Sequence, residues 1–340
     1  MPVLTADKLT ELSAKLLLAA GVRQKYARLV SAHLVEANLC GVDSHGVIRI
    51  PQYVRAIRAG DVNPSADITV VRETASTALI DGGNGFGQVA CEAAMKMAIE
   101  KAENTVISAV GLFRSFHIGR LADYAEMAAK RGMIGVVACN SVPWVAPWGG
   151  RQRLLGTNPI CFAIPSGQGR PILVDVSTSA SSEGKVRVKR ARREALPEGW
   201  ILDKKGQRST NPSDLYEGGA LLPMGAHKGF SLALVIDILA GALTIGQING
   251  EVPRPFNNVF LEAIKIEGFR ALKDFEATVD RLLKRLKACP PAAGFEMVVI
   301  PGDPESEVRE KRLKEGISIE DSTWEEIKSL CGESGVDCPS

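Results

Sequence analysis

The sequence predicts an α/β fold of the α+β kind, in which strands and helices together build a large domain and helices build a smaller one. Three observations predict it. Strand-like apolar runs alternate with helical runs in the middle of the chain, helical patterns occupy both of its ends, and 340 residues suffice for two domains. The composition, 45% hydrophobic and 24% charged, is that of an ordinary globular protein.

Charge and apolar patterning argue against several classes of protein. A net charge of +2 gives no general attraction to nucleic acid or to a membrane surface, and no apolar run approaches the roughly 20 residues that span a bilayer. The basic stretch 185–193 lacks interleaved aromatic residues, so we interpret it as a solvated face. The seven cysteines form no Cys-x-x-Cys pair and no cluster with histidine, so we expect no metal site. We also expect no signal peptide and a cytoplasmic location.

The chain begins with two helical patterns, over residues 5–20 and 24–40. Apolar residues of the second recur at helical spacing, with charges between them: Ala27, Val30, Leu34 and Ala37. We expect a small helical unit that ends at the segment 43–53, and a linker over 57–67, where glycine, asparagine and proline gather.

A glycine-rich stretch, residues 82–87, lies between the strand-like run 77–81 and a helical run over 89–103. It does not fit the pattern Gly-x-Gly-x-x-Gly, because Gln88 occupies the last position. The strand before it ends in aspartate, and no second βαβ unit follows in the order that a Rossmann domain requires. We therefore interpret this stretch as a tight turn and not as a dinucleotide-binding loop.

The remaining elements follow in order. Strand-like runs cover residues 68–71, 106–110, 133–139, 160–164, 172–176, 258–266 and 296–300. Helical patterns cover residues 121–131, 231–243 and 270–288, and two charged helices finish the chain. The loop 143–159, rich in glycine, proline and tryptophan, separates two of the strands.

The segment 43–53 carries the clearest chemistry. His45 can exchange a proton near neutral pH, and Arg49 can hold a carboxylate through two parallel hydrogen bonds. If the segment is helical from Ser44, His45 and Arg49 lie one turn apart on the same face and can reach one small molecule together. The alternative is a capped loop whose histidine bonds only to the backbone.

Three of the four histidines lie beside glycine at junctions between elements, and the fourth, His33, lies inside a helical pattern and is interpreted as structural. His117 and His227 each precede a helix, whose positive end favours a phosphate or pyrophosphate, and Lys228 is a phosphate partner of the same kind. Each motif alone also fits an ordinary turn. Together they indicate a shared anion-binding cleft.

These motifs resemble those of the malate/L-lactate/sulfolactate dehydrogenase-like family of NAD(P)-dependent 2-oxoacid and cyclic imino acid reductases. The matching segments run in order from about residue 5 to about residue 330. They are Asp43-Ser-His-Gly-Val with Arg49, Pro51 and Tyr53; Ser115-Phe-His-Ile-Gly; Gly149-Gly150 with Gly156-Thr-Asn-Pro; Asp175 with Thr178-Ser179 and Gly184-Lys185; Pro197-Glu-Gly-Trp with Asp203; Pro223-Met-Gly with Lys228-Gly; and Pro301-Gly-Asp.

The resemblance implies a non-Rossmann NAD(P)-binding domain with a large mixed sheet, and a helical domain made from the N-terminus and the C-terminal helices. We place the helical domain at residues 1–70 with 303–340 and the NAD(P)-binding domain at 71–302. The resemblance further implies a homodimer whose active site lies near the subunit interface, and a small-molecule carboxylate as substrate. NAD and NADP remain alternatives.

The resemblance also assigns roles. Ser44 and His45 would form a proton relay with His45 as proton donor, Arg49 would bind the substrate carboxylate, and His117 is the rival acid or base. The implied cofactor-binding residues are His117, Ile118, Gly119, Arg120, Leu121, Asp175, Ser177, His227, Lys228, Gly302, Asp303, Pro304 and Glu305. Three departures from the family pattern are Phe116 in place of an asparagine, Arg120-Leu121 in place of small residues, and a segment 244–257 that is shorter than usual and lacks a glycine-rich loop.

The expected function is hydride transfer between a nicotinamide and a small 2-hydroxy acid or 2-oxoacid, such as malate, lactate or sulfolactate. One alternative is a reductase of a cyclic imino acid, a pyrroline or piperideine carboxylate, in which the proton goes to nitrogen. A second alternative is a non-catalytic nucleotide-binding protein that keeps the cleft.

Overall fold

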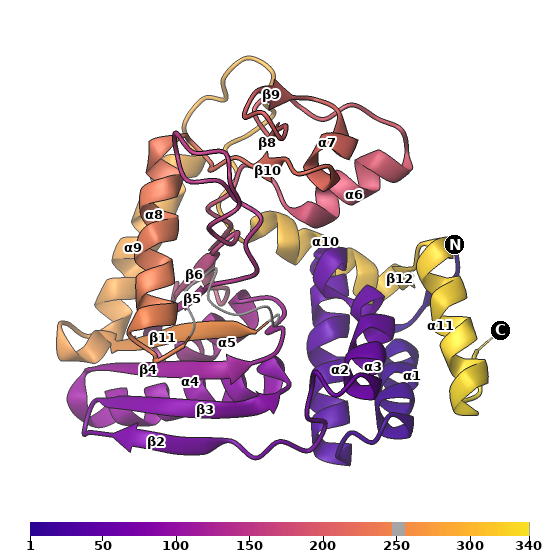
Figure 1. Ribbon diagram of the computed structural model, residues 1–340. Helices are drawn as coiled ribbons and strands as arrows, with labels where there is room; N and C mark the ends of the chain where they lie inside the picture. The colour runs from indigo at the N-terminus through magenta and orange to yellow at the C-terminus, as the bar shows by residue number, and fades with distance from the viewer. Residues whose placement is uncertain (247–255, 340) are drawn as a thin grey trace.

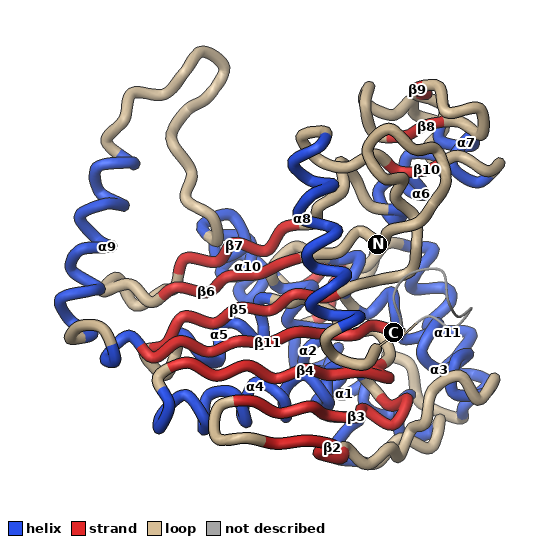
Figure 2. Tube along the Cα trace, turned by 60° about the vertical axis from the view of Figure 1, so that its left-hand side comes forward, coloured by secondary structure: helices blue, strands red, loops and turns tan. Residues whose placement is uncertain are grey.

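The computed structural model describes residues 1–246 and 256–339. A seven-stranded mixed sheet forms its centre, in the strand order β2-β3-β4-β11-β5-β6-β7 (Figures 1 and 2). β3 and β4 pair in parallel, and the other neighbours pair antiparallel. The strands are β2 (Thr69–Glu73), β3 (Thr77–Gly85), β4 (Ile107–Ser115), β5 (Met133–Cys139), β6 (Ile160–Ile164), β7 (Ile172–Val176) and β11 (Asn257–Lys265). The predicted large mixed sheet is confirmed.

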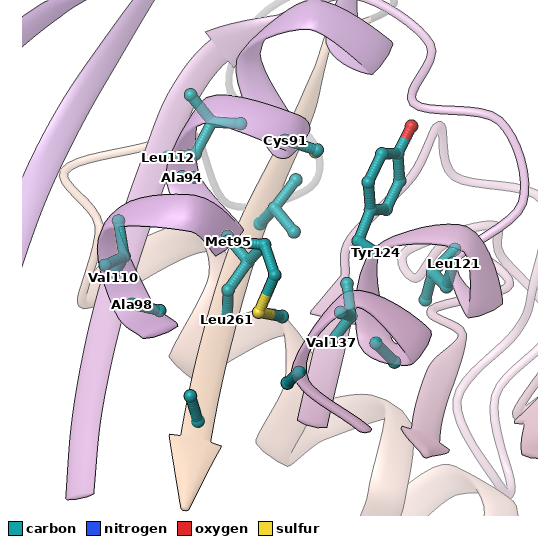
Figure 3. Close-up of a cluster of buried hydrophobic side chains, with 14 of the residues drawn as sticks. Cys91, Ala94, Met95, Ala98, Val110, Leu112, Leu121, Tyr124, Val137 and Leu261 are labelled. Carbon is teal, nitrogen blue, oxygen red and sulfur yellow. The ribbon is translucent and has the colours of Figure 1, made fainter. Parts of the chain in front are cut away.

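Helices α4 (Gly87–Thr105) and α5 (Ala122–Ala129) cover one face of this sheet. Alternate residues of β4, among them Val110 and Leu112, are buried against α4, as a strand's period of two requires. α4 meets them with small residues and Met95, which lets the helix lie close to the strands (Figure 3). Burial of each large apolar side chain in this core contributes roughly 1.5–3 kcal/mol.

The opposite face of the sheet carries α8 (His227–Asp237) and the π-helical turn η3 (Ile238–Ala242), and in Figure 2 α8 crosses in front of the strands. Gly111 of β4 faces this side, because a Cβ there would lie 2.9 Å from the side chain of Thr244. α9 (Leu272–Lys287) lies at the outer edge of the molecule (Figure 1). Above the sheet, α6 (Glu183–Ala191) and α7 (Pro212–Tyr216) pack with a small sheet of β8 (Ile201–Leu202), β9 (Arg208–Ser209) and β10 (Ala220–Leu221).

Helices from both ends of the chain share a second core, as the sequence predicted. They are α1 (Ala6–Ala19), α2 (Gln24–Leu39), α3 (Ile50–Arg58) and α11 (Asp321–Ser334), and α10 (Asp303–Glu315) packs on α2. The hydroxyl of Thr5 caps α1 by accepting a hydrogen bond from the Lys8 N–H. β1 (Val3–Leu4) pairs with β12 (Ile317–Ser318) and ties the two ends together.

Two local predictions are wrong. The run 296–300 forms no strand; Met297 and Val299 are exposed, and among the described residues no neighbouring strand pairs with the run. The glycine-rich stretch is not a tight turn, because β3 continues through it to Gly85. A register shift against β4 accommodates it, and Gly83 adopts a positive φ of 60°.

The predicted helix 231–243 is present in two parts, since α8 gives way to η3 at Ile238. Most of the shortened segment 244–257 lies outside the described residues. Within residues 1–246 and 256–339, no helix is long and apolar enough to cross a membrane. The same residues contain no group of three or more histidine, cysteine, aspartate or glutamate side chains arranged to hold a metal ion.

The helices α1, α2, α3, α10 and α11 are called the helical layer below. His33 links this layer to the helices that cover the large sheet. From α2, its Nδ1 lies 3.1 Å from Asp123 Oδ2 in α5, and its Nε2 lies 3.6 Å from Glu92 Oε2 in α4. Burial alone would lower the pKa of His33, but the bonds to Asp123 and Glu92 outweigh it and raise the pKa to about 9. The imidazole is therefore charged at neutral pH and bridges two carboxylates.

This bridge predicts a pH-dependent stability. Because the folded pKa of His33 lies above its unfolded value near 6.5, the bridge contributes fully below about pH 6.5 and is lost as the pH rises through about 9. We expect His33→Gln to lower the free energy of unfolding by about 1–3 kcal/mol at pH 6, and the wild-type advantage to vanish near pH 10. Urea unfolding of both proteins across this range measures it. His227→Gln, at an exposed histidine, is the matched control, and a pH-independent difference for His33→Gln would contradict the bridge.

Candidate active site

The segment that carries His45 does not form the single helix from Ser44 that the sequence analysis considered. Two 3₁₀ turns, η1 (Asp43–His45) and η2 (Val47–Arg49), flank Gly46, whose backbone is extended at φ −87° and ψ −154°. α3 begins directly afterwards, with Pro51 in its first turn, where the missing N–H of proline costs nothing. His45 and Arg49 still border the same cavity, because the break redirects the chain without separating them.

Asp43 anchors this segment to the helical layer. Its carboxylate accepts two hydrogen bonds from the guanidinium of Arg312 in α10, at 2.6 and 3.1 Å, and one from the Asn38 amide at 2.6 Å. The side-chain Oδ1 of Asn38 in turn accepts from the Val47 N–H at 2.8 Å. A charge-assisted, bidentate bond of this kind fixes position as well as adding energy.

Gly46 completes the anchor. A Cβ on this residue would fall deep inside van der Waals contact with the Asn38 side chain. Any larger residue must push the segment away from α2 or break the bonds of Asn38. The glycine beside the histidine is thus required by a close approach and not by its own φ.

The second half of the site follows β4. Phe116 packs edge-on against Tyr53 of α3, at 5.5 Å between ring centroids, and His117 follows it into the cavity. The Ile118 N–H donates to Asn257 Oδ1 at 3.3 Å, and the Ile118 carbonyl accepts from the buried Tyr124 hydroxyl. The sheet therefore fixes His117, whereas the helical layer fixes His45.

A cavity of about 300 Å³ lies between these two segments. Seven of the predicted site residues border it: Ser44, His45, Arg49, His117, Ile118, Gly119 and Leu121. The sequence assigned no role to the other bordering residues, which are Gln52, Phe116, Cys139, Ser141, Val142, Trp144, Thr157, Pro159, Ser182, Glu183, Gly184 and Asn257. Trp144 and Thr157 lie in the loop 143–159, whose unusual composition was the available signal; Asn257 offered none.

The imidazoles of His45 and His117 stack, with centroids 5.4 Å apart and planes inclined by 24°. Burial and the charge of Arg49 lower the pKa of His45 to about 4, and burial, Arg49 and His45 lower that of His117 well below its usual value. Both rings are neutral at pH 7, so the protonated imidazole that a proton donor needs is not the resting form of His45.

Arg49 is oriented by the protein. Its Nε donates to the Ser44 carbonyl at 2.7 Å, and its Nη1 donates to Gln52 Oε1 at 2.7 Å. Within the described part of the chain no bond is found for Nη2. Nη2 and the second N–H of Nη1 can therefore receive a carboxylate, while Nε and the first N–H of Nη1 hold the site segment in place.

The other predicted cofactor residues do not border this cavity. Arg120 and Glu305 line a second cavity, of about 510 Å³, beside α2 and α10. Asp175 accepts a hydrogen bond from the Ala122 N–H at 3.0 Å, so a carboxylate of the protein already occupies part of the positive end of α5. Ser177 bonds to Ser179 and Thr157, His227 and Lys228 are exposed where α8 begins, and Gly302, Asp303 and Pro304 lie where α10 begins.

Comparison with known proteins decides the family. The model of the malate/L-lactate dehydrogenase family matches residues 4–328. The chain belongs to this family.

Its relatives include a malate dehydrogenase of Pyrococcus abyssi, 39% identical over 97% of this chain and 94% of that protein. A malate/(S)-sulfolactate dehydrogenase of Methanothermus fervidus is 37% identical over 98% and 99% of the two chains. The solved sulfolactate dehydrogenase of Methanocaldococcus jannaschii superposes with a TM-score of 0.92 at 34% identity, over 99% of this chain and 98% of that one. This chain is a dehydrogenase of the 2-hydroxyacid class.

The anchor at Gly46 generates a prediction. We expect Gly46→Ala to destabilise the protein by about 1–3 kcal/mol, as overpacking does, and to lower its catalytic rate by displacing His45. Gly332→Ala in α11 is the control, since a Cβ there meets nothing within 4 Å. Thermal unfolding and steady-state kinetics measure both variants. If Gly46→Ala is as stable and as active as Gly332→Ala, the close approach to Asn38 is not a constraint.

Proposed function

We propose that the protein transfers a hydride between NAD or NADP and a small 2-hydroxy acid or the corresponding 2-oxoacid, of the malate, lactate or sulfolactate type. One observation carries the proposal: a fixed guanidinium and two neutral imidazoles border the same 300 Å³ cavity. A small 2-hydroxy acid needs one group for its carboxylate and one for its hydroxyl proton. The dehydrogenase relatives act on substrates of this class by name.

The cavity also fits a nicotinamide ring. Trp144, Val142 and Leu121 give it apolar walls on which a flat ring can lie, and Ser141 and Thr157 offer hydroxyls to an amide. Gly184 leaves space at the border, since a Cβ there would meet nothing closer than 3.8 Å. When bound, the nicotinamide supplies the hydride chemistry. Arg120 and Glu305, which line the second cavity of about 510 Å³, are proposed to contact the adenosine half of the cofactor.

Arg49 is proposed to hold the substrate carboxylate through Nη2 and the second N–H of Nη1. The bonds of Nε and Nη1 to the protein prevent the guanidinium from following the substrate, so the carboxylate sets the position of the neighbouring carbon. Burial is the main cause of the lowered pKa of His45 and the charge of Arg49 is the second, and arrival of the carboxylate offsets that charge. Substrate binding therefore makes His45 a stronger base.

His45 is proposed to move the proton. During oxidation, its neutral imidazole accepts the proton of the substrate hydroxyl and afterwards releases it to solvent. During reduction, the same nitrogen first takes a proton from solvent and gives it to the developing alkoxide. The Ser44 hydroxyl, 3.0 Å from His45 Nδ1, can donate or accept and so follows either state. A group with a resting pKa of about 4 is deprotonated at physiological pH, as the oxidation direction requires.

A cyclic imino acid remains a second candidate substrate, because one solved neighbour, at a TM-score of 0.89 and 29% identity, is a delta1-piperideine-2-carboxylate reductase of Pseudomonas syringae. That reaction uses the same carboxylate contact with a proton on nitrogen. Neither the family nor the site supports the third alternative, a non-catalytic nucleotide-binding protein.

We further propose that the protein is a homodimer. The outward face of α8 and η3 is apolar, with Leu234, Val235 and Ile238 exposed by 44%, 51% and 50%. The inward face, with Ala233 and Ile236, already packs on the protein. A helix that is apolar on both faces fits a contact with a second copy of the chain.

The catalytic assignment is tested by following NADH and NADPH absorbance with a panel of 2-oxoacids and cyclic imino acids. We expect 2-oxoacids to be reduced, and His45→Ala to lower turnover by about 10²- to 10⁴-fold while NADH binding, measured by fluorescence, is unchanged. Arg49→Lys should mainly raise KM, because a point charge replaces a bidentate contact.

Full activity of His45→Ala would remove this residue from the proton step. Exclusive reduction of imino acids would establish the second candidate. A wild-type protein that oxidises neither cofactor with any substrate would refute the proposed function.

The dimer is tested by sedimentation at micromolar concentration. We expect a dimeric wild type and a monomeric Val235→Glu, because a charge in an apolar contact is costly to desolvate. Val188→Glu places the same charge at an equally apolar, 40% exposed position on α6 and should leave the dimer intact. A monomeric wild type, or equal behaviour of the two variants, would rule out this surface.

A further inference from the structure

Tyr53 joins the buried interior of α3 to the active site. Its ring is fully buried between Phe86 and Phe116, and its hydroxyl lies 2.6 Å from His117 Nδ1. The same hydroxyl oxygen accepts a hydrogen bond from the Nε2 of Gln88, at 2.7 Å. Gln88 is also fully buried, in the first turn of α4. Side chains from α3, from α4 and from the loop after β4 thus form one chain of hydrogen bonds that ends at the cavity.

The direction of this chain follows from counting protons. A tyrosine hydroxyl carries one hydrogen, and its oxygen accepts a hydrogen bond from the N–H of Gln88. The hydroxyl hydrogen is fully buried and needs an acceptor, and within the described residues His117 Nδ1 is the acceptor in reach, so we infer that His117 Nδ1 accepts it. A neutral imidazole has one protonated nitrogen, so the proton of His117 lies on Nε2. Burial raises the pKa of Tyr53 to about 12, which keeps its hydroxyl protonated.

His45 has a different kind of partner. Its Nδ1 faces the hydroxyl of Ser44, which is partly exposed and has no second side-chain partner among the described residues. This hydroxyl can turn to donate or accept, so it tolerates either protonation state of His45. The Tyr53 hydroxyl cannot turn without losing its bond to His117 or to Gln88. One histidine is free to change its protons and the other is not.

We propose that Tyr53 and Gln88 are positioning residues that hold His117 as a neutral imidazole with its proton on Nε2, so that His117 donates a hydrogen bond to the reacting oxygen and His45 alone moves the proton. This division of labour rests on the proposed function. It assigns the proton step to His45 and not to His117, on the basis of the direction of a hydrogen-bond chain. A fixed neutral donor stabilises the charge that builds on the oxygen during reduction without itself being consumed.

The tautomer can be measured without substrate, by ¹⁵N NMR of protein labelled in its four histidines, with His117→Gln to assign the His117 signals. In the wild type we expect an unprotonated Nδ1 and a protonated Nε2 over the whole range in which the protein is folded. In Tyr53→Phe, which keeps the ring and removes only the hydroxyl, the proton should divide between the two nitrogens. We expect kcat to fall on the order of tenfold, the effect of one hydrogen bond, with KM changed by less than about twofold.

Tyr124→Phe is the matched control. It removes another buried tyrosine hydroxyl, one that bonds to the carbonyl of Ile118 and therefore holds the same segment without touching the imidazole. It should leave the His117 tautomer unchanged. Gln88→Met removes the donor to Tyr53, frees its hydroxyl to turn, and should also give a mixed tautomer. Should Tyr53→Phe fail to fold, the wild-type and Gln88→Met spectra still decide the question.

A proton on Nδ1 of His117 in the wild type would overturn the inference. So would a Tyr53→Phe spectrum identical to that of the wild type, or equal changes in Tyr53→Phe and Tyr124→Phe. Because these spectra need no turnover, they remain decisive if the substrate panel fails, and that failure would count against the proposed function alone.

Discussion

The hydrogen bonds accepted by the Asp43 carboxylate are the interaction on which the candidate site depends. The carboxylate is bound by Arg312 from near the end of the chain and by Asn38 from α2, and this triad fixes the backbone from which His45 and Arg49 project. The energy of such a contact is modest beside that of the hydrophobic cores. Its importance is geometric, because a catalytic group displaced by about an ångström can lose on the order of 10²-fold in rate.

The two halves of the site therefore have different supports. His45 and Arg49 are held by the helical layer, and His117 is held by the end of β4 and by Asn257 of β11. Burial between these supports keeps both imidazoles neutral beside the permanent positive charge of Arg49, an arrangement suited to bind an anion. In the proposed function, an anionic substrate offsets that positive charge and so raises the basicity of His45.

Much of this architecture could be predicted from the sequence. The periodicity at residues 5–20 and 24–40 corresponds to α1 and α2 within about one residue, since apolar spacing reports burial directly. The predicted strand 296–300 is wrong because its apolar residues find no neighbouring strand to pair with in the described part of the chain. The turn predicted at residues 82–87 is wrong because these glycines relieve close approaches along a strand. Local sequence cannot distinguish such a strand from a turn.

The candidate site shows the same limit. His45, Arg49 and His117 could be found because their chemistry is visible in the residue type. Arg312 and Gln88 could not, because an arginine in a charged helix and a glutamine after glycine look like ordinary surface residues. Their roles arise from contacts with Asp43, 269 positions earlier, and with Tyr53, 35 positions earlier.

The place of β11 has a consequence for synthesis. This strand, residues 257–265, inserts between β4 and β5, which the ribosome makes more than a hundred residues earlier. Until it emerges, the growing polypeptide has two strands whose shared neighbour is missing, and each presents unpaired backbone groups to other nascent chains. The sheet can close only after β11 has been made, so holding chaperones have their greatest effect during that interval.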